Sequence, residues 1–326
     1  MWRRVYYQGL ENYEENGLDR KKVVLASPRG FCAGVVRAID TVNLALEVYG
    51  QPIYVRREIV HNKFVVNELR QKGIIFVNEL NEVPIGGRVI FSAHGVAPEI
   101  SAAAIKRSLK VIDATCPLVT KVHREAIKYA NMGYTIILIG HSDHDEVIGT
   151  LGEVPGSIMV LDPEDEIKAL EVPDPKKVVY LTQTTLSLND TRAIVDRLRQ
   201  RFPLITSPAS EDICYATQNR QSAVLDLTRK AELILVVGSA NSSNSRRLVE
   251  VALGAGTPAY LIDDIENIKL SWLDGVQKIG LTAGASAPEE LVARVTNYLN
   301  GLGYPDIETT GGIVENVQFS LPPELT

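Results

Sequence analysis

The sequence alternates between short, wholly apolar stretches and longer segments in which apolar residues recur at helical spacing. Each apolar stretch runs into glycine or small polar residues, which is typical of a buried strand followed by a loop and a helix. This order of elements occurs three times along the chain, so we treat it as an internal repeat. The predicted strands lie within residues 22–31, 52–62, 74–77 and 88–98 in the first copy, 111–116, 134–147, 157–162 and 177–187 in the second, and 205–214, 233–245, 258–264 and 277–288 in the third.

Strands that alternate with helices and are apolar along their whole length form parallel sheets covered on both faces. The repeat therefore predicts an α/β fold of three quasi-repeated lobes, each a small parallel sheet flanked by helices, arranged pseudo-threefold around a central cavity. Ligands of such sheets bind beyond the carboxyl ends of the strands. The predicted segments are an N-terminal extension (1–22), a first lobe (23–110), a second lobe (111–204), a third lobe (205–302) and a C-terminal segment that packs back on the core (303–326).

Composition narrows the class of protein. The 326 residues are 45% hydrophobic and 23% charged, which is ordinary for a globular protein with a sizeable core. A net charge of −6 without a dense Lys/Arg block argues against nucleic acid as the main partner. No apolar run approaches the ~20 residues that span a bilayer, and the N-terminal residues lack the apolar core of a secretory signal. We therefore expect a cytoplasmic protein that does not insert into membranes.

The three cysteines, Cys32, Cys116 and Cys214, occupy the same place in the three copies, each directly before a predicted helix. Their odd number, without a signal peptide, indicates a reducing compartment and metal binding or catalysis rather than disulfides. A lone cysteine is most often a small buried hydrophobe, but three at matching positions favour one shared metal centre. A helix N-terminus lowers the pKa of a thiol and stabilises the thiolate that zinc or iron needs. The close cysteine pairs of structural zinc sites are not evident, so an iron–sulfur cluster is favoured over zinc, although the spacing alone does not decide between them.

The predicted loops after the strands share a chemistry of hydroxyl, amide, imidazole and small residues. Helix N-termini follow most of these loops, and such groups bind anions through charge-assisted and backbone hydrogen bonds. Ordinary N-capping is the alternative for some of them, in particular Asn189, Ser245 and Ser286. All but one of the five histidines lie in or beside these loops, which comprise residues 61–62, 92–95, 141–146, 182–185, 241–244 and 283–286.

Glu146 lies two residues after His144 in a loop rich in donors, and it is a candidate proton donor. The alternative is a solvated acid in the first turn of a helix, where its charge is favourable. Neither glycine-rich turn, at 29–34 or at 236–245, matches the dinucleotide fingerprint, and the sequence contains no Walker A motif. Reducing electrons would therefore come from a protein donor rather than from a bound nucleotide.

Several motifs occur in the order of a known family: RGFCAGVVRAI, REIVHN, FSAHGV, DATCPLVTKVH, IGHSDHDEVIGT, TQTTLS, DICYATQNRQ, VGSANSSNSRRL and TAGASAP. Together they resemble the 4-hydroxy-3-methylbut-2-enyl diphosphate reductases, from about Val23 to the C-terminal segment. The resemblance implies a three-lobed iron–sulfur reductase in the last step of the non-mevalonate (MEP/DXP) route to isoprenoid precursors. Its reaction would be the two-electron reductive dehydroxylation of (E)-4-hydroxy-3-methylbut-2-enyl diphosphate to isopentenyl diphosphate and dimethylallyl diphosphate.

Carried over by motif, the resemblance assigns Cys32, Cys116 and Cys214 as ligands of one [4Fe–4S] cluster that keeps one iron open. Thr184 and Glu146 would hydrogen-bond the substrate hydroxyl and relay its proton, and ferredoxin or flavodoxin would donate the electrons. The residues that match the diphosphate-binding positions are His61, His94, His144, Ser242, Asn244 and Ser286, with Ser243 beside them.

Two other functions compete with this interpretation. A cluster-bearing redox sensor or electron carrier would need no substrate, and it would have no use for so many anion-binding loops. An iron–sulfur dehydratase would use the open iron without net reduction, and a requirement for an external reductant separates it from a reductase. Val36 stands where many relatives carry an acidic residue, but this position lies on a helix and leaves the catalytic assignments unchanged.

Overall fold

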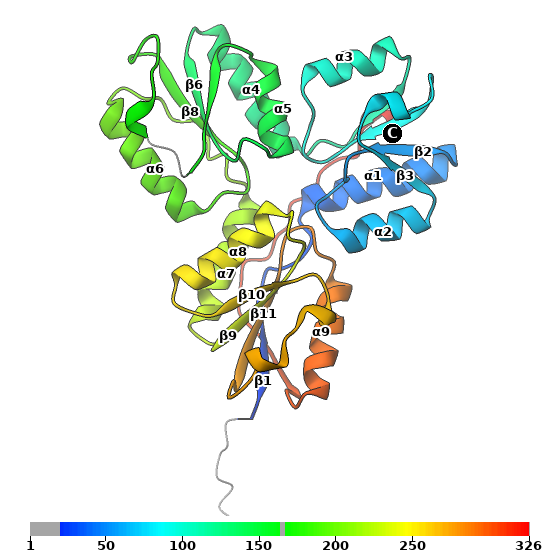
Figure 1. The fold of residues 1–326 in the computed structure, drawn as a ribbon, viewed down its shortest axis with the longest axis vertical. Coiled ribbons are helices and arrows are strands. Elements are labelled where there is room, and N and C mark those ends of the chain that lie inside the picture. Colours follow the sequence, from blue (N-terminus) through cyan, green and yellow to red (C-terminus); the bar gives the residue numbers. More distant parts are fainter. Residues whose placement is uncertain (1–19, 164–166, 326) are drawn as a thin grey trace, which may run out of the picture.

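The computed structural model describes residues 20–163 and 167–325. Figure 1 shows three lobes around a common centre, each built from one sheet with helices against it. The strands of these sheets pair in parallel, which confirms the predicted α/β class with three small parallel sheets. The predicted N-terminal extension, 1–22, lies outside the described residues except for its last three positions. Within the described ranges, no helix is both long and apolar enough to cross a bilayer.

The first lobe carries a four-stranded sheet in the order β3 (Ile74–Val77), β2 (Ile53–Arg56), β4 (Arg88–Phe91) and β5 (Lys110–Asp113). Helices α1 (Ala33–Tyr49) and α2 (Lys63–Gln71) pack their buried aliphatic side chains on one face of this sheet. Helix α3 (Pro98–Lys106) and the 3-10 helix η1 (Leu80–Glu82) cover the other face. The sheet is therefore buried on both faces, as its continuous apolar strands require.

The second lobe has a three-stranded sheet in the order β7 (Ile158–Leu161), β6 (Thr135–Ile139) and β8 (Val178–Thr182). Helices α4 (Pro117–Asn131) and α5 (Asp145–Glu153) cover one face. Helix α6 (Leu188–Arg201) and the 3-10 helix η2 (Ile167–Ala169) cover the other face. Alternate residues of β6 point into these two cores, so that both sides of the strand are apolar.

The third lobe has five strands in the order β10 (Ala259–Ile262), β9 (Leu233–Val237), β11 (Lys278–Ala283), β1 (Lys22–Leu25) and β12 (Asp306–Thr309). Helix α9 (Glu289–Gly301) covers one face together with the 3-10 helices η3 (Ile265–Asn267) and η4 (Leu270–Trp272). Helices α7 (Tyr215–Thr228) and α8 (Ser243–Gly254) cover the other face.

The sheets cross the predicted lobe boundaries, which are corrected accordingly. β1 opens the predicted first lobe but pairs with β11 and β12 of the third sheet. β5 lies at the start of the predicted second lobe but pairs with β4 of the first sheet. Val23 and Val24 of β1 are completely buried, and β11 and β12 of the third sheet pair with the two edges of this strand.

The third predicted opening strand, at 205–214, does not form. A single parallel bridge joins Thr206 to Val179 of β8, and Pro208 soon afterwards removes an N–H that a strand ladder would need. The segment before Cys32 therefore pairs with the third sheet, the one before Cys116 with the first sheet, and the one before Cys214 bridges to the second sheet. After each cysteine the chain enters the first, second and third lobe, respectively, through a helix. This arrangement puts the three cysteines at the junctions between lobes.

The C-terminal residues after β12 run back across the first and third lobes without regular structure until the 3-10 helix η5 (Pro323–Leu325). Arg37 of α1 donates to the carbonyl of Ser320 at 2.7 Å, and Glu315 pairs with the buried Arg220 of α7 at 3.0 Å. These contacts draw the segment toward the helices that begin at Cys32 and Cys214.

Candidate functional site

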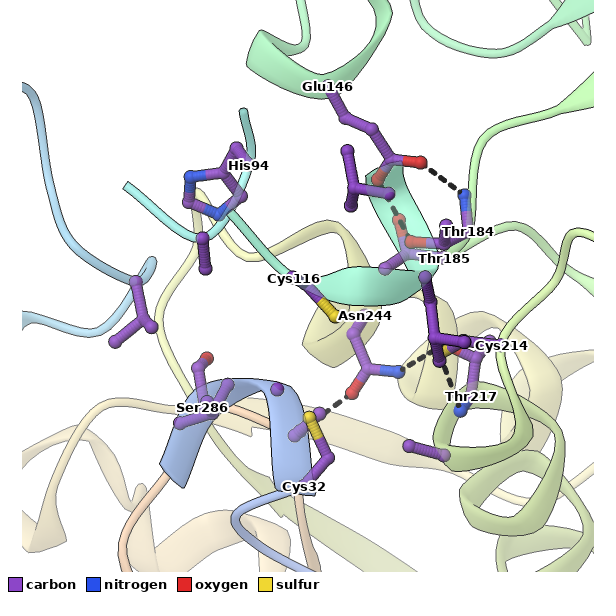
Figure 2. A pocket seen from close by; sticks show the side chains of 18 of the residues that line it. Cys32, His94, Cys116, Glu146, Thr184, Thr185, Cys214, Thr217, Asn244 and Ser286 are labelled. Atoms are coloured by element: carbon purple, nitrogen blue, oxygen red, sulfur yellow. Dashed lines mark hydrogen bonds between the residues drawn. The ribbon is translucent and has the colours of Figure 1, made fainter. Parts of the chain in front are cut away.

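One cavity of about 110 Å³ lies where the three lobes meet, and Figure 2 shows the side chains that line it. The carboxyl ends of the strands and the N-termini of several helices face this cavity, as expected for parallel α/β sheets. All site residues predicted from the sequence line it, namely Cys32, Cys116, Cys214, His61, His94, His144, Glu146, Thr184, Ser242, Ser243, Asn244 and Ser286.

The three cysteines are the N-cap residues of α1, α4 and α7. Gly34 in the first turn of α1 leaves room for the sulfur atoms of Cys32 and Cys116. A Cβ added at Gly34 would lie 2.7 Å from the Cys116 sulfur and 3.8 Å from the Cys32 sulfur. Three sulfur donors line one cavity, and two of them lie beside the space left free by Gly34. This arrangement fits an iron–sulfur cluster, because thiolates are the ligands such clusters prefer.

Burial raises the pKa of the Cys116 thiol to about 12 and that of the Cys214 thiol to about 11. Hydrogen bonds from the first turns of α4 and α7 lower both pKa values only in part, while the neighbouring cysteines raise them further. The sequence-based expectation of a lowered pKa is therefore wrong for these two free thiols, because desolvation outweighs the helix N-terminus. A bound cation is what would keep such thiols ionised.

Glu146 lies in the first turn of α5 and is only 3% exposed, which excludes the alternative of a solvated helix-end acid. The Thr184 N–H donates to Oε1 of Glu146 at 2.7 Å, and the Thr184 hydroxyl donates to Oε2 at 2.9 Å (Figure 2). Burial raises the pKa of Glu146 to about 7, although both hydrogen bonds from Thr184 oppose the shift. A carboxyl group with this pKa exchanges a proton readily near neutral pH.

Three imidazole rings form a cluster that lines the same cavity. The rings of His61 and His94 stack with centroids 4.0 Å apart, and His144 meets both rings edge-on. Burial lowers the pKa of His94 well below its ordinary value and that of His144 to about 4, and the neighbouring rings add to both shifts. These two rings are therefore neutral hydrogen-bonding groups at physiological pH.

The third lobe contributes the start of α8. Ser242 is the N-cap, and its hydroxyl accepts the N–H of Ser245 at 3.3 Å. Asn244 accepts the N–H of Ala285 at 2.8 Å, which fixes its side chain beside the cysteines (Figure 2). Ser286 donates to the carbonyl of His61 at 2.9 Å and so connects the third lobe to the histidine cluster. Free N–H groups at such a helix start attract anions.

Two histidines do not line the cavity. His123 is buried in α4 and pairs with Glu153 at 2.9 Å, consistent with the packing role considered from the sequence. His141 lies 3.5 Å from Asp162 in a separate surface hollow. The backbone N–H of His141 donates to Oε1 of Gln183, in the loop after β8, at 3.1 Å.

Several residues near the site escaped the sequence analysis. Phe319 of the C-terminal segment lines the cavity, although no periodic pattern marks that segment. Gly34 lies within the RGFCAGVVRAI motif, but its closeness to two sulfur atoms depends on how the lobes pack. Glu58 accepts from Asn241 at 2.7 Å across two lobes, and neither residue carries a sequence signal for this pairing.

Comparison with known proteins supports one family. The pattern of the family described as LytB protein matches residues 23–300. A 4-hydroxy-3-methylbut-2-enyl diphosphate reductase from Acidothermus cellulolyticus is 55% identical over 309 residues, which cover 94% of this chain and 91% of the relative. The enzyme of the same description from Dechloromonas aromatica is 55% identical over 304 residues, which cover 93% and 99% of the two chains.

Solved structures agree with the sequence matches. The E-1-hydroxy-2-methyl-but-2-enyl-4-diphosphate reductase from Plasmodium falciparum superposes with a TM-score of 0.91 at 41% identity, covering 94% of this chain and 97% of that one. A structure described as (E)-4-hydroxy-3-methyl-but-2-enyl diphosphate reductase, the terminal enzyme of the non-mevalonate pathway, gives a TM-score of 0.62 at 31% identity. It covers 86% of this chain and 99% of that one.

Proposed function

Because this chain belongs to the LytB family of 4-hydroxy-3-methylbut-2-enyl diphosphate reductases, we propose that it catalyses the family reaction. The substrate is (E)-4-hydroxy-3-methylbut-2-enyl diphosphate, and the products are isopentenyl diphosphate and dimethylallyl diphosphate. The observation that carries the proposal is the convergence of three cysteines, a buried Glu146–Thr184 pair and a histidine cluster on one cavity. Membership of the family also implies an iron–sulfur cluster.

Cys32, Cys116 and Cys214 would hold this group as a [4Fe–4S] cluster, one ligand from each helix start. When bound, a cluster with only three protein ligands supplies electrons together with one iron position open to the substrate hydroxyl. The thiols fit this role, since they are half-buried, free of disulfides and line the same cavity.

The diphosphate group would bind among the histidine cluster and the start of α8. His94 and His144 are neutral and can donate hydrogen bonds from a ring N–H to phosphate oxygens. A neutral ring avoids the free-energy cost of removing a charged imidazolium from water. Ser242, Asn244 and Ser286 add hydroxyl and amide groups from the third lobe, with Ser243 beside them. Binding by groups from different lobes fixes the allylic end of the substrate against the cysteines and keeps bulk water away from it.

Glu146 would supply the proton that allows the substrate oxygen to leave as water. The Thr184 hydroxyl would relay that proton from Glu146 to the substrate oxygen. In the balanced reaction, one C–O bond breaks, two electrons and two protons enter, and one C–H bond and one water molecule form. The buried carboxyl is suited to this role because its pKa of about 7 keeps a protonated fraction at neutral pH. The second proton reaches either end of the allyl system, which accounts for two products.

The electrons would come from a ferredoxin or a flavodoxin, because the sequence contains no fingerprint for a nucleotide cofactor. This partner class and the pathway are consistent with a cytoplasmic protein.

The decisive experiment incubates the anaerobically prepared protein with the substrate, with and without a reduced viologen dye. We expect both five-carbon diphosphates to form only when the dye is present. Conversion without a reductant would indicate a dehydratase instead. Absence of any conversion, with an intact cluster and reduced dye, would favour an electron carrier or sensor.

A further inference from the structure

The three histidines of the cluster differ in the partner of their Nδ1 atom. In His61, Nδ1 lies 3.3 Å from Oε2 of Glu58. In His94, Nδ1 lies 3.2 Å from the hydroxyl of Ser92, and in His144 the same atom accepts the Glu146 N–H at 3.2 Å. Among these rings, only His61 therefore has a carboxylate against its Nδ1.

Glu58 is itself held in place from another lobe. Asn241, in the loop after β9, donates its amide N–H to the same Oε2 of Glu58 at 2.7 Å. The hydrogen bond with His61 lowers the pKa of Glu58, with help from Asn241, so the carboxylate stays charged. A fixed carboxylate on Nδ1 orients an imidazole ring and leaves its Nε2 free for another partner.

The titratable and polar groups around His61 come from several elements. His94 and His144 present neutral rings, since burial and neighbouring rings lower the pKa of both. Asp145 at the start of α5 offers an oxygen within 4.8 Å of His61 and His94 ring nitrogens, but this carboxylate is already paired with Arg57. The positive charge of Arg70, on α2, helps to lower the pKa of Glu58. The third lobe faces His61 with the uncharged side chains of Asn241 and Ser286.

We propose that Glu58 is a positioning residue that makes His61 the proton-accepting member of the cluster, so that a diphosphate group binds together with one proton taken up from solution. An imidazolium between a carboxylate and a phosphate is stabilised from both sides, whereas a second or third imidazolium in the same cluster would be repelled. The inference rests on the proposed function, because it assumes that the cluster holds the diphosphate.

The sign of the pH effect follows from this proton uptake. If the complex holds one more proton than the free partners, diphosphate affinity falls as pH rises through the neutral range. Removal of the Glu58 charge weakens the preference for an imidazolium at His61. The pH dependence of affinity should then flatten, and affinity near pH 7 should fall by about tenfold, as expected for a lost charge-assisted contact.

Titration calorimetry with inorganic pyrophosphate tests this directly on the anaerobically prepared protein with its cluster. Measurements in two buffers of different ionisation enthalpy count the protons taken up per pyrophosphate. Glu58→Gln keeps the shape of the side chain and removes its charge. Glu68→Gln is the matched control, because Glu68 is a half-exposed acid that pairs with Lys72 on α2 and does not contact the histidine cluster.

We expect Glu58→Gln to bind pyrophosphate about tenfold more weakly and to take up fewer protons than the unaltered protein, while Glu68→Gln behaves like the unaltered protein. The visible absorption of the cluster should be the same in all three. Asn241→Ala, which frees Glu58 without changing charge, should shift affinity and proton uptake in the same direction by a smaller factor. This second variant decides the question if Glu58→Gln does not fold.

Two negative results have different meanings. Unchanged affinity and proton uptake in Glu58→Gln, or in Asn241→Ala if that is the variant measured, would overturn the role of Glu58 and leave the proposed function intact. Failure of the unaltered, cluster-loaded protein to bind pyrophosphate at all would instead contradict the diphosphate assignment of the cavity.

Discussion

Thr184 donates both its backbone N–H and its hydroxyl to the two carboxyl oxygens of Glu146, at 2.7 and 2.9 Å. The pair joins the loop after β8 to the first turn of α5, inside a single lobe. Both residues are buried, at 6% and 3% exposure, so water does not compete for these hydrogen bonds. The Glu146 carboxyl group at the cavity therefore has the Thr184 hydroxyl as a fixed partner for proton exchange.

Glu146→Gln should lower turnover by ~10²-fold or more, the range for loss of general-acid catalysis. Glutamine keeps the size of the side chain but has no exchangeable acidic proton. Turnover is measured with excess artificial reductant, alongside substrate affinity and cluster absorption. We expect affinity and absorption to change little, because other residues hold the diphosphate and the cluster. Near-normal turnover would remove Glu146 from the proton path.

The pH dependence of turnover should follow the same carboxyl group. Burial raises the pKa of Glu146 to about 7, so the proton is largely present below this pH and largely lost above it. Turnover at saturating substrate should therefore fall as pH rises through about 7. Single-turnover measurements on pre-reduced protein avoid changes in the reductant itself. A rate that stays constant from pH 6 to pH 8.5 would contradict the assignment.

Gly34→Ala should prevent stable assembly of the metal centre. The added Cβ would lie 2.7 Å from the Cys116 sulfur, closer than side chains tolerate, so the sulfur or α1 must move. Iron content per chain should fall to less than half, while far-ultraviolet circular dichroism stays unchanged. Gly254→Ala is the control, because a Cβ at Gly254 near the end of α8 meets no atom within 4 Å. Equal iron content in both variants would show that Gly34 is not needed for space.

Glu315→Gln should lower the stability of the protein, because Glu315 attaches the C-terminal segment to Arg220 of α7. Arg220 is completely buried and donates to the carbonyls of Gly30 and Ala216 and to Glu315, so loss of the carboxylate leaves a buried cation without its counter-charge. The free energy of unfolding should fall by about 1–3 kcal/mol in urea titration. Glu290→Gln removes an exposed partner of Arg294 and should leave the free energy of unfolding nearly unchanged. The same small effect in both variants would refute a structural role for the buried pair.

The sequence was sufficient for the parts of the site that depend on local order. The cysteines could be singled out because each precedes a helix in a repeated pattern. Glu146 could be singled out as a candidate because it lies two residues after His144 in a loop rich in donors. Parallel strands that end at one sheet edge also made a shared cavity predictable.

Features that depend on contacts between lobes could not be predicted in this way. β1 has the pattern of any buried strand, and nothing in the pattern indicates that its partners are β11 and β12, more than 250 residues later. The Glu58–Asn241 contact joins two loops that lie 183 residues apart in the chain. The thiol pKa values were misjudged for a related reason, since desolvation depends on how tightly the lobes close around Cys116 and Cys214.

The central claim is that one cysteine from each helix start holds a shared iron–sulfur cluster, and the metal and sulfide content of anaerobically purified protein tests it most directly. We predict about four iron and four sulfide ions per chain, with broad absorption near ~400 nm that is lost in air. Cys32→Ser, Cys116→Ser and Cys214→Ser should each reduce this content, whichever lobe carries the change. Stoichiometric zinc without iron or sulfide, or full cluster content in any one of the three variants, would contradict the account.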